Sequence, residues 1–325
     1  MTALPARLVS RFPSAAWFVC ASLLVILSSL AILGALKIHR EQSMILEIEA
    51  IGGAVEKAEG GPDWLRYVVG GPALASFDRI ERVLVPNLSV TDDWLIRLQE
   101  LRHIEELVLD GTGLTDDQLL LLQEMTELRS LSILGTRVTD AGLPSLRRMK
   151  KLERLVLSET AITDAGLAHL AGLHSLQDLK LEGTGISDRG LMHLAGLTNL
   201  HSLLVARTAV GDDGLAYLRG LPWLDALDLS GTRVTDDGLA HLKAFPRLAR
   251  LELGGNRVTE AGLIHLVEIA DLEALSLIGL ELSDAVVDHL VRLKQLQHLY
   301  VYSTGISNEG VQRLKVALPE CRIHR

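Results

Sequence analysis

Residues 155–178 read LVLSETAITDAGLAHLAGLHSLQD, and this stretch decides the fold because its pattern recurs in register along most of the chain. Ten rows of 24 residues follow one another without insertion or deletion; they begin at Val83, Leu107, Leu131, Leu155, Leu179, Leu203, Leu227, Leu251, Leu275 and Leu299. The first position is Leu in nine of the ten rows, and the sixteenth is Leu in all ten. A fixed period of this length predicts stacked repeats that share one continuous core.

Each row divides into a strand half and a helix half. The L-x-L spacing at the start of the row predicts a short strand whose first and third residues point inward. The T-D-x-G-L-x-x-L half predicts a short helix, with Thr163 as its N-cap, Asp164 at the positive end of the helix dipole, and Leu167 and Leu170 facing the core. We therefore predict an α/β solenoid that is curved, with parallel strands on the concave face and short helices on the convex face.

The sixth row position carries Thr in seven rows and Asn256 in one. A threonine stacked there can donate its hydroxyl to a neighbouring backbone carbonyl.

The phrase G-T-x-[IV]-T-D-x-G-L, as in residues 231–239, resembles the rows of bacterial membrane-anchored leucine-rich repeat proteins, and residues 317–323 are similar to their closing segment. The same phrase is also similar to the substrate-receptor repeats of ubiquitin-ligase adaptors. Those repeats place Cys where this chain has Thr, and the F-box that accompanies them is not found in this sequence.

The N-terminal part differs in composition from the rows. Residues 14–36 contain no charged residue, and a helix of this length can cross the hydrocarbon core of a membrane. They predict a single-pass membrane anchor after a short tail at 1–13. A cleaved signal peptide is the alternative, although the apolar run is longer than such peptides need. Basic residues flank the segment equally on both sides, and we expect the repeat domain on the extracytoplasmic side.

Residues 37–82 connect this segment to the rows at 83–325. We expect a juxtamembrane helix that ends at Gly52-Gly53, followed by an N-terminal cap that contains the Trp64 block. A cap is needed because the end of a solenoid otherwise exposes its core.

Charge and cysteine content bear on the possible partners and on disulfide bonding. The net charge of −9 disfavours nucleic acid as a partner, because an acidic surface repels the phosphate backbone. Cys20 and Cys321 lie too far apart in the sequence pattern to suggest a disulfide.

Two columns of side chains suggest metal binding at first sight. His169, His193, His241, His265 and His289 all occupy the fifteenth row position. No carboxylate or cysteine recurs beside them to complete a transition-metal site, so packing histidines are the simpler interpretation. Acidic residues at the tenth position, mostly Asp, could suggest calcium, but their place at a helix start already accounts for them. No nucleophile motif or phosphate loop is present. We therefore expect no cofactor, no metal site and no enzymatic activity.

The outward residues of the strands vary from row to row, which is typical of a binding face. Near the C-terminus we predict a partner-binding patch with the composition of interface hot spots, formed by Tyr300, Tyr302, Ile278, His298, Arg250 and Glu252. The tyrosines could instead shield the last rows. A weaker candidate is the apolar group of Leu204, Ala206 and Val156.

The sequence thus favours a membrane-tethered module that binds a protein or peptide on its concave face. Alternatives are a structural spacer of the cell envelope without a ligand, a receptor like those of the ligase adaptors, and a metal-dependent enzyme that uses the histidine column.

Overall fold

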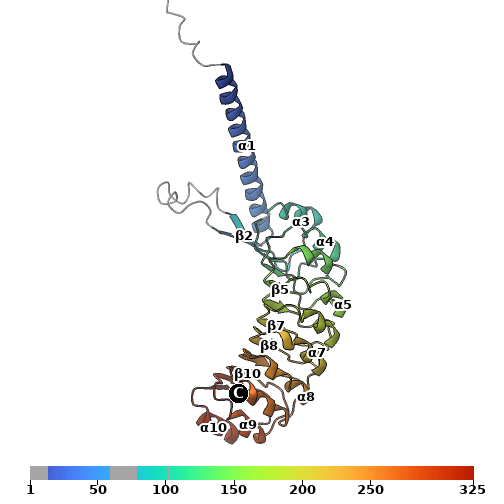
Figure 1. Ribbon diagram of the computed structural model, residues 1–325, viewed down its shortest axis with the longest axis vertical. Coiled ribbons are helices and arrows are strands. Elements are labelled where there is room, and N and C mark those ends of the chain that lie inside the picture. Colours follow the sequence, from blue (N-terminus) through green and yellow to red (C-terminus); the bar gives the residue numbers. More distant parts are fainter. Residues whose placement is uncertain (1–13, 59–78, 102) are drawn as a thin grey trace, which may run out of the picture.

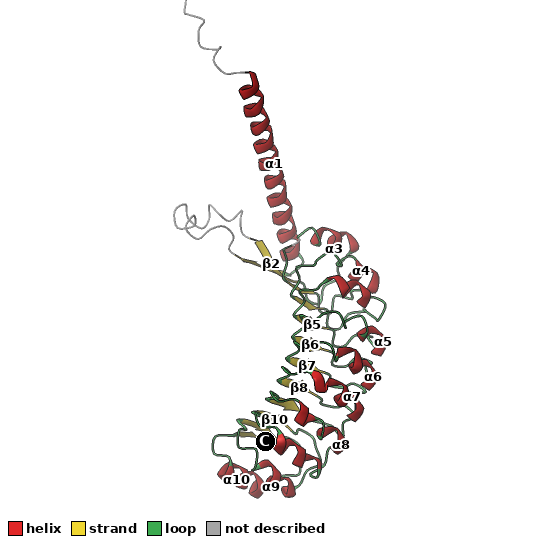
Figure 2. Ribbon diagram, viewed as in Figure 1, coloured by secondary structure: helices red, strands yellow, loops and turns green. Residues whose placement is uncertain are grey.

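The computed structural model describes residues 14–58, 79–101 and 103–325, which form an arc with a long helix at its N-terminal end (Figure 1). Twelve strands make one sheet in chain order, from β1 to β12. Every neighbouring pair from β2 onward is parallel, whereas β1 and β2 are antiparallel. The strands line the inner side of the arc and the helices line its outer side (Figure 2). The solenoid predicted from the rows is therefore confirmed.

The strands are β1 Ala54–Ala58, β2 Arg79–Leu84, β3 Glu106–Val108, β4 Ser130–Ser132, β5 Arg154–Val156, β6 Asp178–Lys180, β7 Ser202–Leu204, β8 Ala226–Asp228, β9 Arg250–Glu252, β10 Ala274–Ser276, β11 His298–Tyr300 and β12 Arg322–His324. The α-helices are α1 Ser14–Ala50, α3 Asp92–Leu98, α4 Asp116–Leu120, α5 Asp164–Leu167, α6 Asp188–Leu191, α7 Asp212–Tyr217, α8 Asp236–Leu239, α9 Val287–Leu290 and α10 Asn308–Ala317. The 3-10 helices are η2 Leu143–Arg148, η3 Met192–Leu194, η4 Leu218–Gly220, η5 Leu242–Ala244, η6 Gly262–Glu268 and η7 Asp284–Val286.

From Leu107 onward, the first residue of each row lies at the centre of its strand and points into the core. Leu107 pairs with Leu131, and Leu131 with Leu155, so the strands stack with no shift between rows. Leu155 and Leu157, at the first and third positions, are both completely buried, as the alternation predicted. Because strands of three residues leave only two outward side chains each, the strands present two columns of side chains on the concave face.

The N-terminal cap is formed by a helix that also contains the predicted anchor. α1 runs without a break from Ser14 to Ala50, so the juxtamembrane helix is not separate from the segment before it. Met44, Ile45 and Ile48 are buried in the same core as the rows. The helix ends as predicted at Gly52, where φ is +87°. The cap is completed by β1 against β2, and the Trp64 block lies outside the described residues.

Ion pairs also fasten this helix to the first row, since Arg97 binds Glu47 and Arg40 lies 3.3 Å from Glu100. Within the described part of the chain, no helix combines the length and the hydropathy required of a bilayer-crossing segment. The tail at 1–13, and many of the side chains between residues 14 and 38, lie outside the described residues. The anchor at 14–36 stays a prediction.

The C-terminal boundary differs from the expectation of ten rows and a closing segment. Residues Arg322–His324 form an additional parallel strand, β12, which pairs with β11 through Leu299 and Ile323. Ile323 follows Leu299 by the row length of 24 residues, so the closing segment continues the ladder by one more strand.

Threonines at the sixth row position do donate to backbone carbonyls, as expected. In all seven rows the hydroxyl binds the carbonyl oxygen three residues earlier, as in Thr160 to Leu157. Asn256 does more, because its amide donates to the carbonyls of Leu229 and Leu253 and thus joins two rows. Threonine therefore braces its own turn, while asparagine also links turns.

Acidic residues at the tenth row position join each row to the next. One carboxylate oxygen of Asp140 accepts from the backbone N–H of Thr163 at 2.8 Å, and the other accepts from its hydroxyl at 2.5 Å. The same two bonds join Asp116 to Thr139, Asp164 to Ser187, Asp212 to Thr235, Asp236 to Thr259 and Asp284 to Ser307. Thr163 occupies the predicted N-cap position, but its hydroxyl makes no cap bond within its own helix, so the predicted capping bond is wrong. The hydroxyl is committed to the previous row instead.

Glycine at the twelfth row position leaves room for these carboxylates. A Cβ on Gly190 would lie 2.5 Å from Oδ1 of Asp164, and on Gly214 it would lie 2.6 Å from Oδ1 of Asp188. Neither glycine has a positive φ, so close approach and not backbone conformation excludes a side chain there.

We expect Asp236→Ala to lower the free energy of unfolding by about 2 kcal/mol, because it leaves the N–H and hydroxyl of Thr259 without their charged acceptor. The adjacent Asp237→Ala is the control, since Asp237 is exposed and occupies the same helix turn. Denaturant unfolding of both variants checks this. Equal loss in the two would show that the helix dipole, and not the bond between rows, accounts for the effect.

Gly190→Ala should destabilise the protein by about 2 kcal/mol through overpacking, although alanine is the better helix former. The control is Gly196→Ala in the same row, where a Cβ would have no neighbour within 4 Å. Thermal unfolding of both variants tests the prediction, and a Gly190 variant as stable as the wild type would contradict it.

Candidate functional site

The concave surface is made of columns that run from strand to strand. Outward residues at the second row position form one column, which in the C-terminal half consists of Asp228, Glu252, Ser276, Tyr300 and His324. The residue before each row start forms a second, with Arg250, Ala274, His298 and Arg322. A ligand on this face would meet side chains only, because the backbone groups of the strands pair with one another.

Three aromatic rings gather at the C-terminal end of these columns. The ring of Tyr300 stacks on that of His324 with centroids 4.4 Å apart and planes 11° from parallel. His298 lies beside both, and its Nδ1 is 3.4 Å from Nε2 of His324. The structure thus brings the predicted residues His298 and Tyr300 together, and adds His324 from β12. The sequence carried a signal for His324, because it occupies the second position of a row that would begin at Ile323.

Tyr302 and Ile278 lie beyond the strands, at the rim of the concave face. They occupy the fourth position of adjacent rows, and the carbonyl of Tyr302 accepts the N–H of Gly279 at 2.9 Å. Their exposed fractions are 43% and 40%, high for large apolar groups. Among the described ring contacts none joins Tyr302 to Tyr300, so the two tyrosines do not form the single pair that the sequence suggested.

Arg250 and Glu252 belong to a different part of the concave face. They lie on β9, and the small residues Ala274 and Ser276 of β10 separate them from β11. Arg250 forms an ion pair of 2.9 Å with Asp225. Both residues instead help to line a hollow of about 450 Å³ that extends along the strands toward Leu204 and Lys180. The patch predicted as one site is therefore two neighbouring surfaces, and the weaker candidate Leu204 joins the second.

The carboxyl of Glu252 has a raised pKa. Partial desolvation by the surrounding concave face is the largest cause, although the side chain stays open to solvent. A hydrogen bond from Ser276 lowers the pKa, and the nearby charge of Asp228 raises it. The raised pKa indicates that the hydrogen bond from Ser276 does not compensate the carboxylate of Glu252 for its lost contact with water.

The histidine column shows no arrangement typical of a metal site. His169 contacts the guanidinium of Arg147 through Nδ1 at 2.6 Å, and His241 contacts Arg219 in the same way. Within the described ranges, no group of three or more His, Cys, Asp or Glu side chains lies close enough to hold an ion. Burial raises the pKa of Cys321 to about 11, so this thiol stays protonated at neutral pH.

These features define a class, namely a repeat solenoid whose strands present a variable concave face. The profile of the family described as "Leucine Rich repeat" matches residues 172–195 and 220–242. No curated protein matches the chain.

Solved structures include an internalin from Listeria monocytogenes, with 20% sequence identity and a TM-score of 0.45, over 75% of this chain and 86% of that one. Another is the plant peptide hormone receptor RGFR1 in complex with RGF2, with 14% identity and a TM-score of 0.44, over 70% of this chain and 40% of the receptor.

Glu252→Gln tests the electrostatics of the concave face. A carboxyl whose pKa is raised in the folded state contributes stability that is present below the unfolded pKa and is lost as pH rises through the folded pKa. We therefore expect the Gln variant to have a higher Tm than the wild type at neutral pH, and the same Tm at pH well below the ordinary glutamate value. Thermal unfolding across this pH range measures the difference, and a constant difference at all pH values would contradict the prediction.

Proposed function

We propose that the protein is a membrane-tethered interaction module that holds a protein or peptide on the concave face of its solenoid and catalyses no reaction. The observation that carries this proposal is the division of the rows into two kinds of residue. Inward positions stay aliphatic throughout, with Leu at the sixteenth position in all ten rows, whereas the outward columns change from row to row. The exposed Tyr302 and Ile278 lie at the rim beside these columns. A purely structural repeat has no need of such variation.

The C-terminal rows supply the contact chemistry. Tyrosine is one of the residue types over-represented among those that dominate binding energy. Tyr302 and Ile278 offer apolar area at the rim, and the ring stack of Tyr300, His324 and His298 offers a rigid wall beside it. The stack costs little ordering on binding, because its rings are already held against one another.

The tether is proposed from the N-terminal segment. Residues 14–36 carry no charge, and α1 exposes a series of large apolar side chains there: Leu23, Leu24, Val25, Ile26, Ile32 and Leu36. Such a surface is unfavourable in water and suited to a bilayer. We place the repeat domain on the extracytoplasmic side of a single-pass segment. Because Ile48 of α1 is buried in the core of the rows, the tether would continue directly from the solenoid without a separate linker.

Affinity capture tests the proposal. The full-length protein and the variant Tyr300→Ala/Tyr302→Ala serve as baits in detergent-solubilised native membranes. We expect at least one protein to be captured by the wild type and lost from the variant, because the variant removes the ring stack and the exposed rim together. Tyr217→Ala is the matched control, since this tyrosine is 46% exposed but lies on α7, on the convex side.

A partner retained by the concave variant but lost from the Tyr217 control would overturn the concave assignment. Capture of no protein by any bait would overturn the interaction module and favour the structural spacer.

A further inference from the structure

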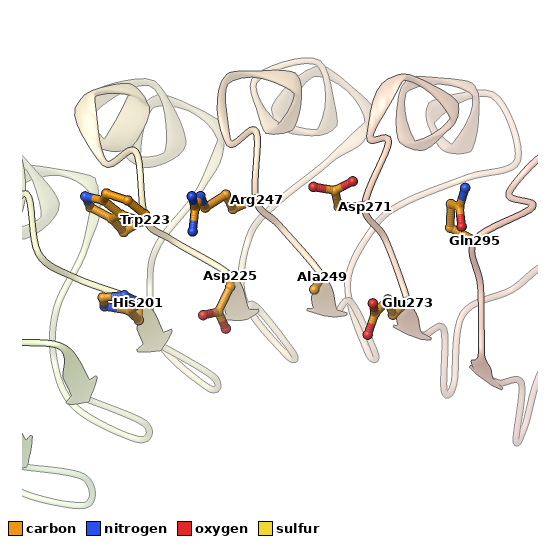
Figure 3. Close-up of a pocket in the computed structure, with 8 residues that line it drawn as sticks. All are labelled: His201, Trp223, Asp225, Arg247, Ala249, Asp271, Glu273 and Gln295. Carbon is orange, nitrogen blue, oxygen red and sulfur yellow. The ribbon is translucent and has the colours of Figure 1, made fainter.

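A second surface lies on the side of the solenoid where each row enters its strand (Figure 3). It is a hollow of about 430 Å³. Trp223, Arg247 and Asp271 line it from the loops before the strands, and Asp225, Ala249 and Glu273 line it at the strand entries. His201 and Gln295 close its two ends.

A single small residue opens this hollow. Ala249 occupies the twenty-third row position. The last row carries Cys321 there, and the eight other rows carry longer polar or charged side chains: Glu105, Arg129, Glu153, Gln177, His201, Asp225, Glu273 and Gln297. The missing side chain leaves a notch between Asp225 and Glu273. The rows on either side are otherwise in register, so the notch is a local departure and not a consequence of curvature.

One wall of the notch is an ordered aromatic stack. Trp223 is 40% exposed, its ring lies 6.2 Å from that of His201, and Cζ of Arg247 lies 4.0 Å from its centroid. The cation–π contact holds the guanidinium of Arg247 over the indole, on the side away from Asp271 (Figure 3). Arg247 is thereby kept from neutralising the carboxylates on the opposite wall.

The opposite wall is acidic and lacks cations. Asp225 is paired with Arg250, but Asp271 and Glu273 form no ion pair with any residue in the described ranges. The backbone cannot take part, because the N–H of Glu273 already donates to Ala249 and that of Ala249 to Asp225. With Asp225 paired to Arg250 and Arg247 held over Trp223, the carboxylates of Asp271 and Glu273 remain without an ion pair in the described part of the chain and give the notch a negative potential, in a chain whose net charge is −9.

We propose that this notch binds a lysine or arginine side chain on an extended basic segment of a partner protein. The aliphatic stem of the side chain packs over Ala249 and against the exposed edge of Trp223, and the cationic end meets Asp271 and Glu273. Long basic side chains suit such a site because they combine an apolar stem with a charged tip. The same carboxylates would repel an acidic ligand or a nucleic acid. This surface shares no described lining residue with the hollow of the concave face, although Asp225 pairs with Arg250 of the second column. The proposal does not depend on the function proposed for that face.

The test uses a fluorescein-labelled oligolysine peptide, and an oligoglutamate peptide of equal length, with the full-length protein in detergent. Fluorescence anisotropy at low and near-physiological ionic strength reports binding. We expect oligolysine to bind the wild type, and Asp271→Asn/Glu273→Gln to weaken binding about tenfold, as the loss of two partly exposed ion pairs implies. Asp117→Asn/Asp237→Asn removes the same charge from exposed positions on α4 and α8, and should leave the affinity nearly unchanged.

A further variant separates a shaped site from a diffuse field. Ala249→Gln fills the notch without changing any charge, and it introduces the residue that two other rows carry at this position, Gln177 and Gln297. We expect it to weaken oligolysine binding by about the same tenfold factor. Equal weakening by the two charge variants, unchanged binding by Ala249→Gln, or tighter binding of oligoglutamate would each overturn the proposal. If Ala249→Gln fails to fold, the comparison of the two charge variants still decides the question.

Discussion

The stacking of this solenoid depends on one carboxylate in each row from Asp116 to Asp284, bonded to the residue that starts the next row's helix half. The hydrophobic effect alone does not fix how the rows align, because leucines attract one another without direction. The bonds from Thr163 to the carboxylate of Asp140 are directional, and equivalent bonds link the helix starts of the neighbouring rows. In an array where each row contacts only its neighbours, stability is a sum of row terms and interface terms. The acidic column supplies a polar part of every such interface from Asp116 to Asp284.

Variants in the column show which part of the interaction is needed. Glu260 reaches the next row with one oxygen, which accepts both the N–H and the hydroxyl of Ser283. Asp188 bonds only to a backbone N–H, because its partner is Gly211. The bond to the backbone is thus common to all these rows, and the hydroxyl reinforces it. Hydrogen bonds from the Ser307 hydroxyl and N–H lower the pKa of Asp284, so this carboxylate stays ionised and a strong acceptor.

Much of this architecture could be predicted from the sequence, because the period of 24 residues assigns each residue a place in its row. The strand centres, the inward leucines and the bonds of the stacked threonines all follow from that place. The hydroxyl of Thr163 was misassigned because a cap motif describes one helix, whereas its partner Asp140 is 23 residues away in the row before. The strand β12 was missed because its row has no helix half to complete it.

The candidate site was predictable only in part, for a related reason. Row position identifies which residues share a column, but contact between columns depends on how far the strands hold them apart. Arg250 and Glu252 share columns with His298 and Tyr300, yet β10 lies between them and presents only Ala274 and Ser276. Conversely, the contact of Arg247 with Trp223 joins loops of adjacent rows, and its formation depends on a rotamer that no periodic pattern specifies.

The C-terminal tyrosines illustrate how one end of a solenoid can meet two demands. The last row must cover its core, and it must leave surface free if it is to hold a partner. Tyr300 meets the first demand, because its ring is stacked on His324 of the terminal strand and is only partly exposed. Tyr302 meets the second, because it lies past the strand, makes no ring contact among the described residues and keeps 43% of its surface open. Shielding and binding therefore need not compete for the same side chain. A separation of two positions in the chain, with Val301 between the tyrosines, is enough to place one ring in the wall and the other at the rim.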